Sequence, residues 1–173
     1  MALRSEPPKG ELKNIRRASL VARILIIYHS QTGNTEKMAQ AVARGAGEIE
    51  NTTVSLKRAF DTKAEDLIEC DGLVIGSPEY FGYMSGAVKD LFDRTYEMLK
   101  GHQRIFRKPF CIFVCAGNDG LFALKHIERI GFGYQFKKVH EPIVCKGQVT
   151  DEVLARCEEM GRIIAAGCEA GIL

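Results

Sequence analysis

The sequence predicts an α/β fold, a three-layer sandwich in which one parallel sheet is covered by helices on both faces. From residue 21 onward, short continuous apolar runs alternate with amphipathic segments. Runs of this kind are typical of strands buried on both faces, and the alternation favours right-handed crossovers between parallel strands. The 173 residues, 46% of them hydrophobic, suffice for one domain with a full core.

Five strands and about five helices are expected in turn. The strands are 22–28, 52–57, 71–76, 109–115 and 138–145, and Pro142 breaks the last of them, which suits a sheet edge because proline has no N–H. The helices are 34–49, 63–69, 85–99, 120–130 and 150–169. Leu121 is expected on the inward face of the fourth helix, and Thr150 is expected to cap the fifth.

The N-terminal residues differ from the rest in composition. Residues 1–21 carry Lys, Arg, Glu and Pro without clear periodicity, and we expect a mobile tail followed by one folded domain over residues 22–173. A transit peptide is the alternative, against which Glu6 and Glu11 argue. No signal-peptide pattern is present in residues 1–20.

Bulk composition excludes several classes of function. A formal net charge of +2 is too small to indicate nucleic-acid binding, and no apolar run approaches the roughly 20 residues that span a bilayer. The six cysteines lie largely in apolar runs, without a CxxC pair or a His/Cys ligand spacing. We therefore expect no metal site, no membrane insertion and a reducing, cytoplasmic setting.

The first expected strand is followed by a loop of small polar residues, Ser30, Gln31, Thr32, Gly33, Asn34 and Thr35. Strand, loop and helix start in this order suit a bound phosphate, because the first N–H groups of a helix lack partners and the helix dipole favours negative charge there. The loop contains no Lys or Arg, which favours a single phosphate on a cofactor over a triphosphate. The alternative is a simple helix cap that binds nothing.

Two further loops follow the third and fourth expected strands. The first offers aromatic side chains for stacking on a flat ligand, and the second can present backbone N–H groups and an amide to a polar ring edge. Ordinary packing of the aromatics, and a plain turn capped by Asp119, are the alternatives. Because all three loops belong at the carboxyl edge of the sheet, together they predict a flavin mononucleotide (FMN) site, with these further binding residues: Ser77, Pro78, Glu79, Tyr80, Phe81, Gly82, Tyr83, Ala116, Gly117, Asn118 and Asp119.

At these residues the chain resembles the flavodoxin-like superfamily. The loop at 30–35 is similar to the flavodoxin phosphate loop. The segment at 76–85 is similar to the flavin loop of NADPH-dependent FMN reductases, and to that of the NAD(P)H:quinone oxidoreductases related to tryptophan-repressor-binding protein. The resemblance covers residues 22–170 and implies a five-stranded sheet of order 2-1-3-4-5 with non-covalent FMN. It implies no catalytic protein residue, because the flavin carries the chemistry.

Two departures from flavodoxins favour a reductase. Flavodoxins are typically acidic and often place an aromatic residue in the third loop, whereas this chain has a pI near 8.2 and no aromatic residue at 116–120. An uncovered ring leaves room for NAD(P)H as donor and for a quinone, a flavin or a redox protein as acceptor. Such a face is also compatible with completion by the second chain of a homodimer. Basic residues gather at Lys100, Arg104, Arg107 and Lys108, where a solvated helix end and loop is the ordinary interpretation. Basic residues would also suit an anionic dinucleotide more than an acidic carrier.

Other functions within this architecture stay open. A flavodoxin-type electron carrier without its own substrate is the main alternative, and a binding module that has lost its flavin is another. A phosphoacceptor receiver would need acids after the first strand, where Tyr28, His29 and Ser30 stand. A low-molecular-weight phosphatase would need an arginine six residues after its cysteine, but Leu121 occupies that offset from Cys115.

Overall fold

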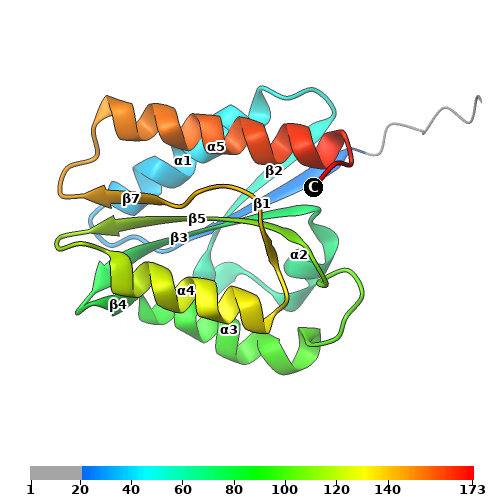
Figure 1. Cartoon of the computed structure of the whole chain (residues 1–173), viewed down its shortest axis with the longest axis horizontal. Coiled ribbons are helices and arrows are strands. Elements are labelled where there is room, and N and C mark those ends of the chain that lie inside the picture. The colour runs from blue at the N-terminus through cyan, green and yellow to red at the C-terminus, as the bar shows by residue number, and fades with distance from the viewer. Residues whose placement is uncertain (1–20) are drawn as a thin grey trace, which may run out of the picture.

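A computed structural model describes residues 21–173, in which one sheet carries helices on both faces (Figure 1). The tail and domain boundary predicted for residues 1–21 lie outside the described residues, Val21 excepted. The strands are β1 (Ala22–Tyr28), β2 (Thr52–Arg58), β3 (Gly72–Tyr80), β4 (Tyr83–Met84), β5 (Pro109–Ala116), β6 (Lys137–Lys138) and β7 (Ile143–Lys146). The helices are α1 (Asn34–Gly47), α2 (Ala64–Glu69), α3 (Gly86–Leu99), α4 (Leu121–Gly133) and α5 (Asp151–Glu169), with a 3₁₀ turn at Ala59–Asp61.

The strand order confirms the predicted fold class. β2, β1, β3 and β5 lie side by side in parallel, and β6 and β7 both pair with the far edge of β5. Counted as the five predicted strands, this is the order 2-1-3-4-5. Thr150 caps α5 as predicted, since its hydroxyl accepts the Val153 N–H at 3.4 Å.

Two details differ from the sequence prediction. The fifth strand is split into β6 and β7, because the chain leaves the sheet at 139–142, around Pro142. The third strand is longer than expected: β3 continues through Tyr80 and turns back as β4, so most of the predicted second loop is a β-hairpin. The sheet therefore has seven strands where five were predicted.

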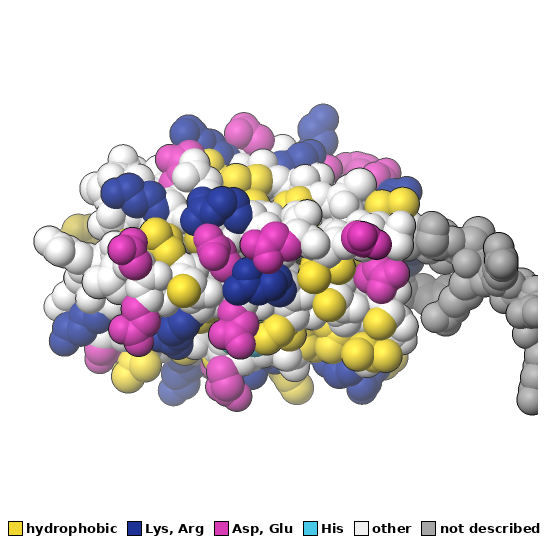
Figure 2. Space-filling view, turned by 90° about the horizontal axis from the view of Figure 1, so that it is seen from above, with side chains coloured by type: hydrophobic (Ala, Val, Ile, Leu, Met, Phe, Trp, Pro, Cys, Tyr) yellow, Lys and Arg dark blue, Asp and Glu magenta, His cyan; other side chains and the backbone are white. Residues whose placement is uncertain are grey.

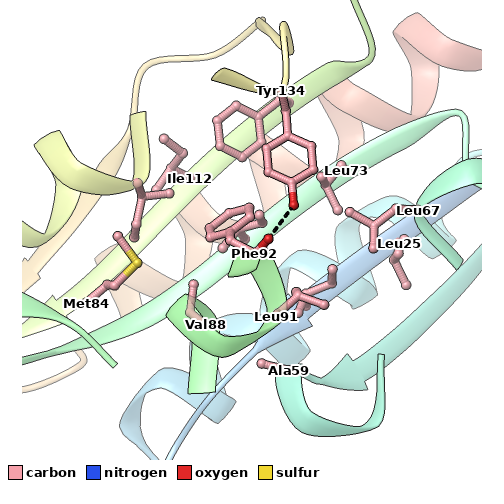
Figure 3. Close-up of a cluster of buried hydrophobic side chains, with 14 of the residues drawn as sticks. Leu25, Ala59, Leu67, Leu73, Met84, Val88, Leu91, Phe92, Ile112 and Tyr134 are labelled. Carbon is pink, nitrogen blue, oxygen red and sulfur yellow. Dashed lines mark hydrogen bonds between the residues drawn. The ribbon is translucent and has the colours of Figure 1, made fainter. Parts of the chain in front are cut away.

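The sheet separates two hydrophobic clusters. α2, α3 and α4 cover one face, and Figure 3 shows part of that cluster, with Val88, Leu91 and Phe92 of α3 and Leu73 of β3 among its members. The Tyr134 hydroxyl crosses this cluster and donates to the Phe92 carbonyl oxygen at 2.7 Å. Burial raises the pKa of Tyr134 to about 12, so the hydroxyl keeps its proton and its hydrogen bond.

α1 and α5 cover the other face and touch through glycines. A Cβ atom on Gly45 would lie 1.9 Å from the carbonyl oxygen of Glu158, and one on Gly161 would lie 2.1 Å from that of Val42. The two backbones are therefore in direct contact. Figure 2 looks onto this layer, where charged side chains of both signs are interspersed. Arg44 pairs with Glu158 at 3.0 Å there.

We predict that Gly45→Ala and Gly161→Ala each destabilise the protein by about 1–3 kcal/mol, because the added methyl group must push the two helices apart. Gly47→Ala is the matched control: it lies in α1 with no atom within 4 Å of its Cβ position. This change should leave stability unchanged or raise it by up to about 1 kcal/mol. Urea denaturation measures all three, and equal stability of the three variants would contradict the close contact.

Candidate functional site

A pocket of about 200 Å³ lies at the carboxyl ends of β1, β3 and β5. It brings together residues from all three predicted loops. Among the described residues that line it, Glu79 alone is charged. The lining consists of Ser30, Gln31, Thr32, Asn34, Thr35, Pro78, Glu79, Tyr80, Cys115, Ala116, Gly117 and Gly147.

The first loop turns sharply into α1. Gly33 precedes the helix in the left-handed region, with φ of 90°, and its N–H donates to the Ser30 hydroxyl at 3.1 Å. No side chain of residues 21–173 caps this helix. The N–H groups of its first turn therefore face the pocket loop without a side-chain acceptor. Thr35 is almost fully buried and lines the pocket.

The second loop is the β3–β4 hairpin. Glu79 pairs with Met84 and Tyr80 with Tyr83, so only Phe81 and Gly82 form the turn. Both have positive φ, 53° and 74°, and a two-residue hairpin turn of this kind favours Asn-Gly or Gly-Gly over a bulky first residue. Phe81 is nevertheless fully exposed.

The three hairpin aromatics have different surroundings. Tyr80 lines the pocket, and its ring lies edge-on to His29, with 6.2 Å between centroids. Tyr83 packs on His126 of α4 at 4.6 Å. Ordinary packing therefore accounts for Tyr83, whereas Phe81 contacts neither helix nor pocket lining. Gly82 also lies outside the pocket lining.

The third loop contributes backbone more than side chains. Ala116 and Gly117 line the pocket, and Asn118 and Asp119 do not. The Asp119 carboxylate accepts the Leu121 N–H at 2.9 Å, while Gly120, with φ of 69°, occupies the N-cap position expected for Asp119. Leu121 was predicted to face the core and is 58% exposed. At the first turn of α4 it lies beside Phe122, which is also exposed.

Sequence reasoning missed two residues of the pocket. Gly147 follows β7, and its N–H donates to the Ala116 carbonyl oxygen at 2.8 Å. The sequence could have indicated Gly147, because the loop after the last parallel strand lies at the same edge of the sheet as the other three loops. Cys115 lines the pocket beside Cys145, and burial raises the pKa of Cys115 to about 11. A protonated thiol is a poor nucleophile, which argues against phosphatase chemistry.

His29 links the first loop to the hairpin and to β2. Its ring lies between Phe60 and Tyr80, with 6.0 Å separating the His29 and Phe60 centroids. Burial, and then the positive charge of Arg58, lower the pKa of His29. The imidazole is therefore neutral around pH 7 and adds no positive charge to this edge.

The basic residues singled out in the sequence lie at the opposite edge. Arg104 donates to the Ile68 carbonyl oxygen at 2.8 Å and pairs with Asp71 at 3.0 Å, and the buried Lys108 donates to the Cys70 carbonyl oxygen. Both side chains thus satisfy carbonyls at the C-terminal end of α2. They line a second cavity, of about 800 Å³, at the amino ends of the strands, so this cluster does not serve an anion in the first pocket.

The first pocket fits the phosphate and the sugar-like chain of FMN by its donor set. Hydroxyls and two amides from residues 30–35 surround an uncapped helix start, and no Lys or Arg lines the space. A phosphate bound there would be held by backbone N–H groups and neutral side chains. No helix among the described residues is long and apolar enough to cross a membrane.

The chain is similar in sequence and in fold to known flavodoxins and flavin reductases. A family model described as NADPH-dependent FMN reductase matches residues 22–151. A flavodoxin of Aquifex aeolicus is 32% identical over 161 residues, covering 84% of this chain and 86% of the relative. An NAD(P)H dehydrogenase (quinone) of Acidithiobacillus ferrooxidans is 32% identical over 114 residues, covering 54% of this chain and 56% of the relative. A solved flavodoxin from the domain Archaea superimposes with a TM-score of 0.73 at 23% identity, covering 85% of this chain and 99% of that one.

We predict that Phe81→Asn stabilises the protein by about 1 kcal/mol, because asparagine tolerates the left-handed conformation better and no contact of an exposed ring is lost. The matched control is Phe132→Asn, which removes another exposed phenylalanine from right-handed helical backbone in α4. It should change stability by less than about 0.5 kcal/mol. Thermal unfolding measures both variants, and a Phe81→Asn variant no more stable than the wild type would show that the turn is not strained.

Proposed function

Because this chain belongs to the NADPH-dependent FMN reductase family, we propose that it binds FMN and transfers electrons from NAD(P)H to a quinone, a free flavin or a similar acceptor. The family membership confirms the resemblance drawn from the loops. The observation that carries the proposal is the meeting of three separately predicted loops in one pocket free of Lys and Arg.

Each loop has a distinct role in the proposal. The loop at 30–35 and the start of α1 hold the phosphate through backbone N–H groups, with Thr35 and Asn34 adding polar side chains. Tyr80 and the backbone of Ala116 and Gly117 border the flavin beyond it. When bound, FMN supplies the redox chemistry, and the protein supplies position, polarity and access.

A reductase is favoured over a carrier by the open rim of the site. Gly117, Asn118 and Asp119 are all exposed, and none of them can cover a flat ring. An acceptor or a nicotinamide could approach from that side. The flavodoxin relative keeps the carrier as the second candidate, and direct reaction with NAD(P)H separates the two functions.

Three further features belong to the proposal. We place the protein in the cytoplasm on the strength of six free cysteines with thiol pKa values raised by burial. We propose a small-molecule acceptor or a redox protein as partner, with no role for nucleic acid. A homodimer would cover apolar side chains exposed at the site edge, Phe81, Leu121 and Phe122.

The test begins with the visible spectrum of the purified protein after incubation with FMN and gel filtration. Retained flavin absorption is expected, followed by oxidation of NADPH or NADH in the presence of a quinone panel at rates above free FMN. Retained flavin without such turnover would favour the carrier. A colourless protein would refute both candidates.

We predict that Thr35→Val weakens FMN binding about tenfold or more, because the hydroxyl of this pocket-lining residue is replaced by a methyl group, which cannot hydrogen-bond a phosphate. Thr53→Val is the matched control, since Thr53 lies on β2 away from the pocket. Fluorescence titration of FMN measures both dissociation constants. Equal affinity in the two variants would place the phosphate elsewhere.

A further inference from the structure

Ser77 was expected to touch the cofactor, but the structure gives its hydroxyl another set of partners. Ser77 lies on β3 four residues before Phe81, the first residue of the hairpin turn; it is fully buried and does not line the pocket. Its hydroxyl donates to the Pro78 carbonyl oxygen at 2.8 Å. It also accepts the Ser85 N–H at 2.9 Å.

These two bonds use the only proton of the hydroxyl and one of its two lone pairs. A serine side chain has one proton to donate, and here the proton is used on Pro78. No donor is left for a ligand. The bond from Ser85, in contrast, joins the outgoing strand of the hairpin to the residue at which the chain returns and enters α3, eight positions later.

The segment between these two residues forms a second wall of the pocket, in addition to the wall formed by residues 30–35. Pro78, Glu79 and Tyr80 lie between Ser77 and Ser85 and all line the pocket. Only two strand pairs, Glu79 with Met84 and Tyr80 with Tyr83, hold the hairpin together beyond its base. Pro78 is also paired with Cys115 of β5, where the main sheet ends. Beyond that point the hairpin has only two strands, an arrangement that is marginally stable when isolated. The buried hydrogen bond from the Ser85 N–H to the Ser77 hydroxyl (the tie) therefore contributes to fixing Glu79 and Tyr80.

The strand end of the tie is itself fixed. Below Ser77, the ring of Phe113 packs on Gly76 so closely that a Cβ there would lie 2.0 Å from the ring. Ser85 caps α3, because its own hydroxyl accepts the Val88 N–H at 3.3 Å. The Ser77 hydroxyl therefore connects a tightly packed strand to the residue that precedes α3, and it does so through the Ser85 N–H and not through the Ser85 hydroxyl.

We infer that Ser77 is a positioning residue for cofactor binding: its hydroxyl closes the base of the β3–β4 hairpin and thereby holds Pro78, Glu79 and Tyr80 against the bound flavin. This role rests on the proposed function, because it assigns the consequence of the tie to FMN. It also replaces the direct contact expected for Ser77 from the sequence.

Ser77→Ala tests the inference, with Ser85→Ala as matched control. Ser77→Ala removes the tie and keeps the volume of the site. Ser85→Ala removes the helix cap but keeps the Ser85 N–H and therefore the tie. Ser77→Thr restores a hydroxyl to the same position and serves as the rescue variant.

Three measurements separate positioning from general stability: the FMN dissociation constant by fluorescence titration, the melting temperature, and hydrogen exchange of the Ser85 amide in the apoprotein. We expect Ser77→Ala to weaken FMN binding about tenfold and to accelerate exchange at Ser85. Ser85→Ala should lower the melting temperature at least as much yet leave FMN affinity within about twofold. Ser77→Thr should recover most of the affinity.

The inference is overturned if the two alanine variants bind FMN equally well. It is also overturned if the affinity that Ser77→Ala loses per degree of lowered melting temperature is no greater than the affinity that Ser85→Ala loses. A wild type that binds no FMN would instead refute the proposed function and, with it, the consequence assigned to the tie. Because hydrogen exchange is measured on the apoprotein, unchanged exchange at Ser85 in Ser77→Ala overturns the inference in either case.

Discussion

The site depends on the parallel pairing of β1, β3 and β5. Tyr28 lies opposite Gly76, and Gly76 lies opposite Phe113, so the carboxyl ends of the three strands lie at one edge of the sheet, with β3 and β5 extending past the end of β1. In an antiparallel sheet, successive loops would alternate between the two edges, and the three loops could not meet. The register is held by burial on both faces, since a slip of one residue would exchange the side chains of the two hydrophobic clusters.

The direction of α1 is the next requirement, because its N-terminus supplies the donors of the first loop. The contacts of Gly45 and Gly161 press α1 against α5 near the far end of α1 from the pocket. A helix transmits such a contact along its axis as a rigid body, so packing remote from the pocket fixes where its first N–H groups point. The absence of a capping side chain among the described residues leaves these groups available to a ligand.

The sequence allowed the strands, the helices and the edge of the sheet that carries the site to be predicted, because periodicity and parallel topology determine them. It did not reveal the β3–β4 hairpin, since the turn lacks the Asn-Gly or Gly-Gly pair that usually marks one: Phe81 stands at the first position. Cys115 escaped notice for another reason. Its thiol looks like any core residue in an apolar run, and only the three-dimensional packing places it under the pocket.

The two principal walls of the pocket differ in how firmly they are held, and this difference explains why Ser77 matters. The first wall belongs to a loop that continues directly into a helix of 14 residues packed on α5. The second belongs to a hairpin with two strand pairs, a left-handed Phe81 at its tip and a buried hydroxyl at its base. Segments with few backbone bonds open at lower cost than helices and central strands. In the proposed function, the phosphate would therefore meet a preformed site, whereas the surface beside the flavin ring would rest on two strand pairs and one side-chain tie.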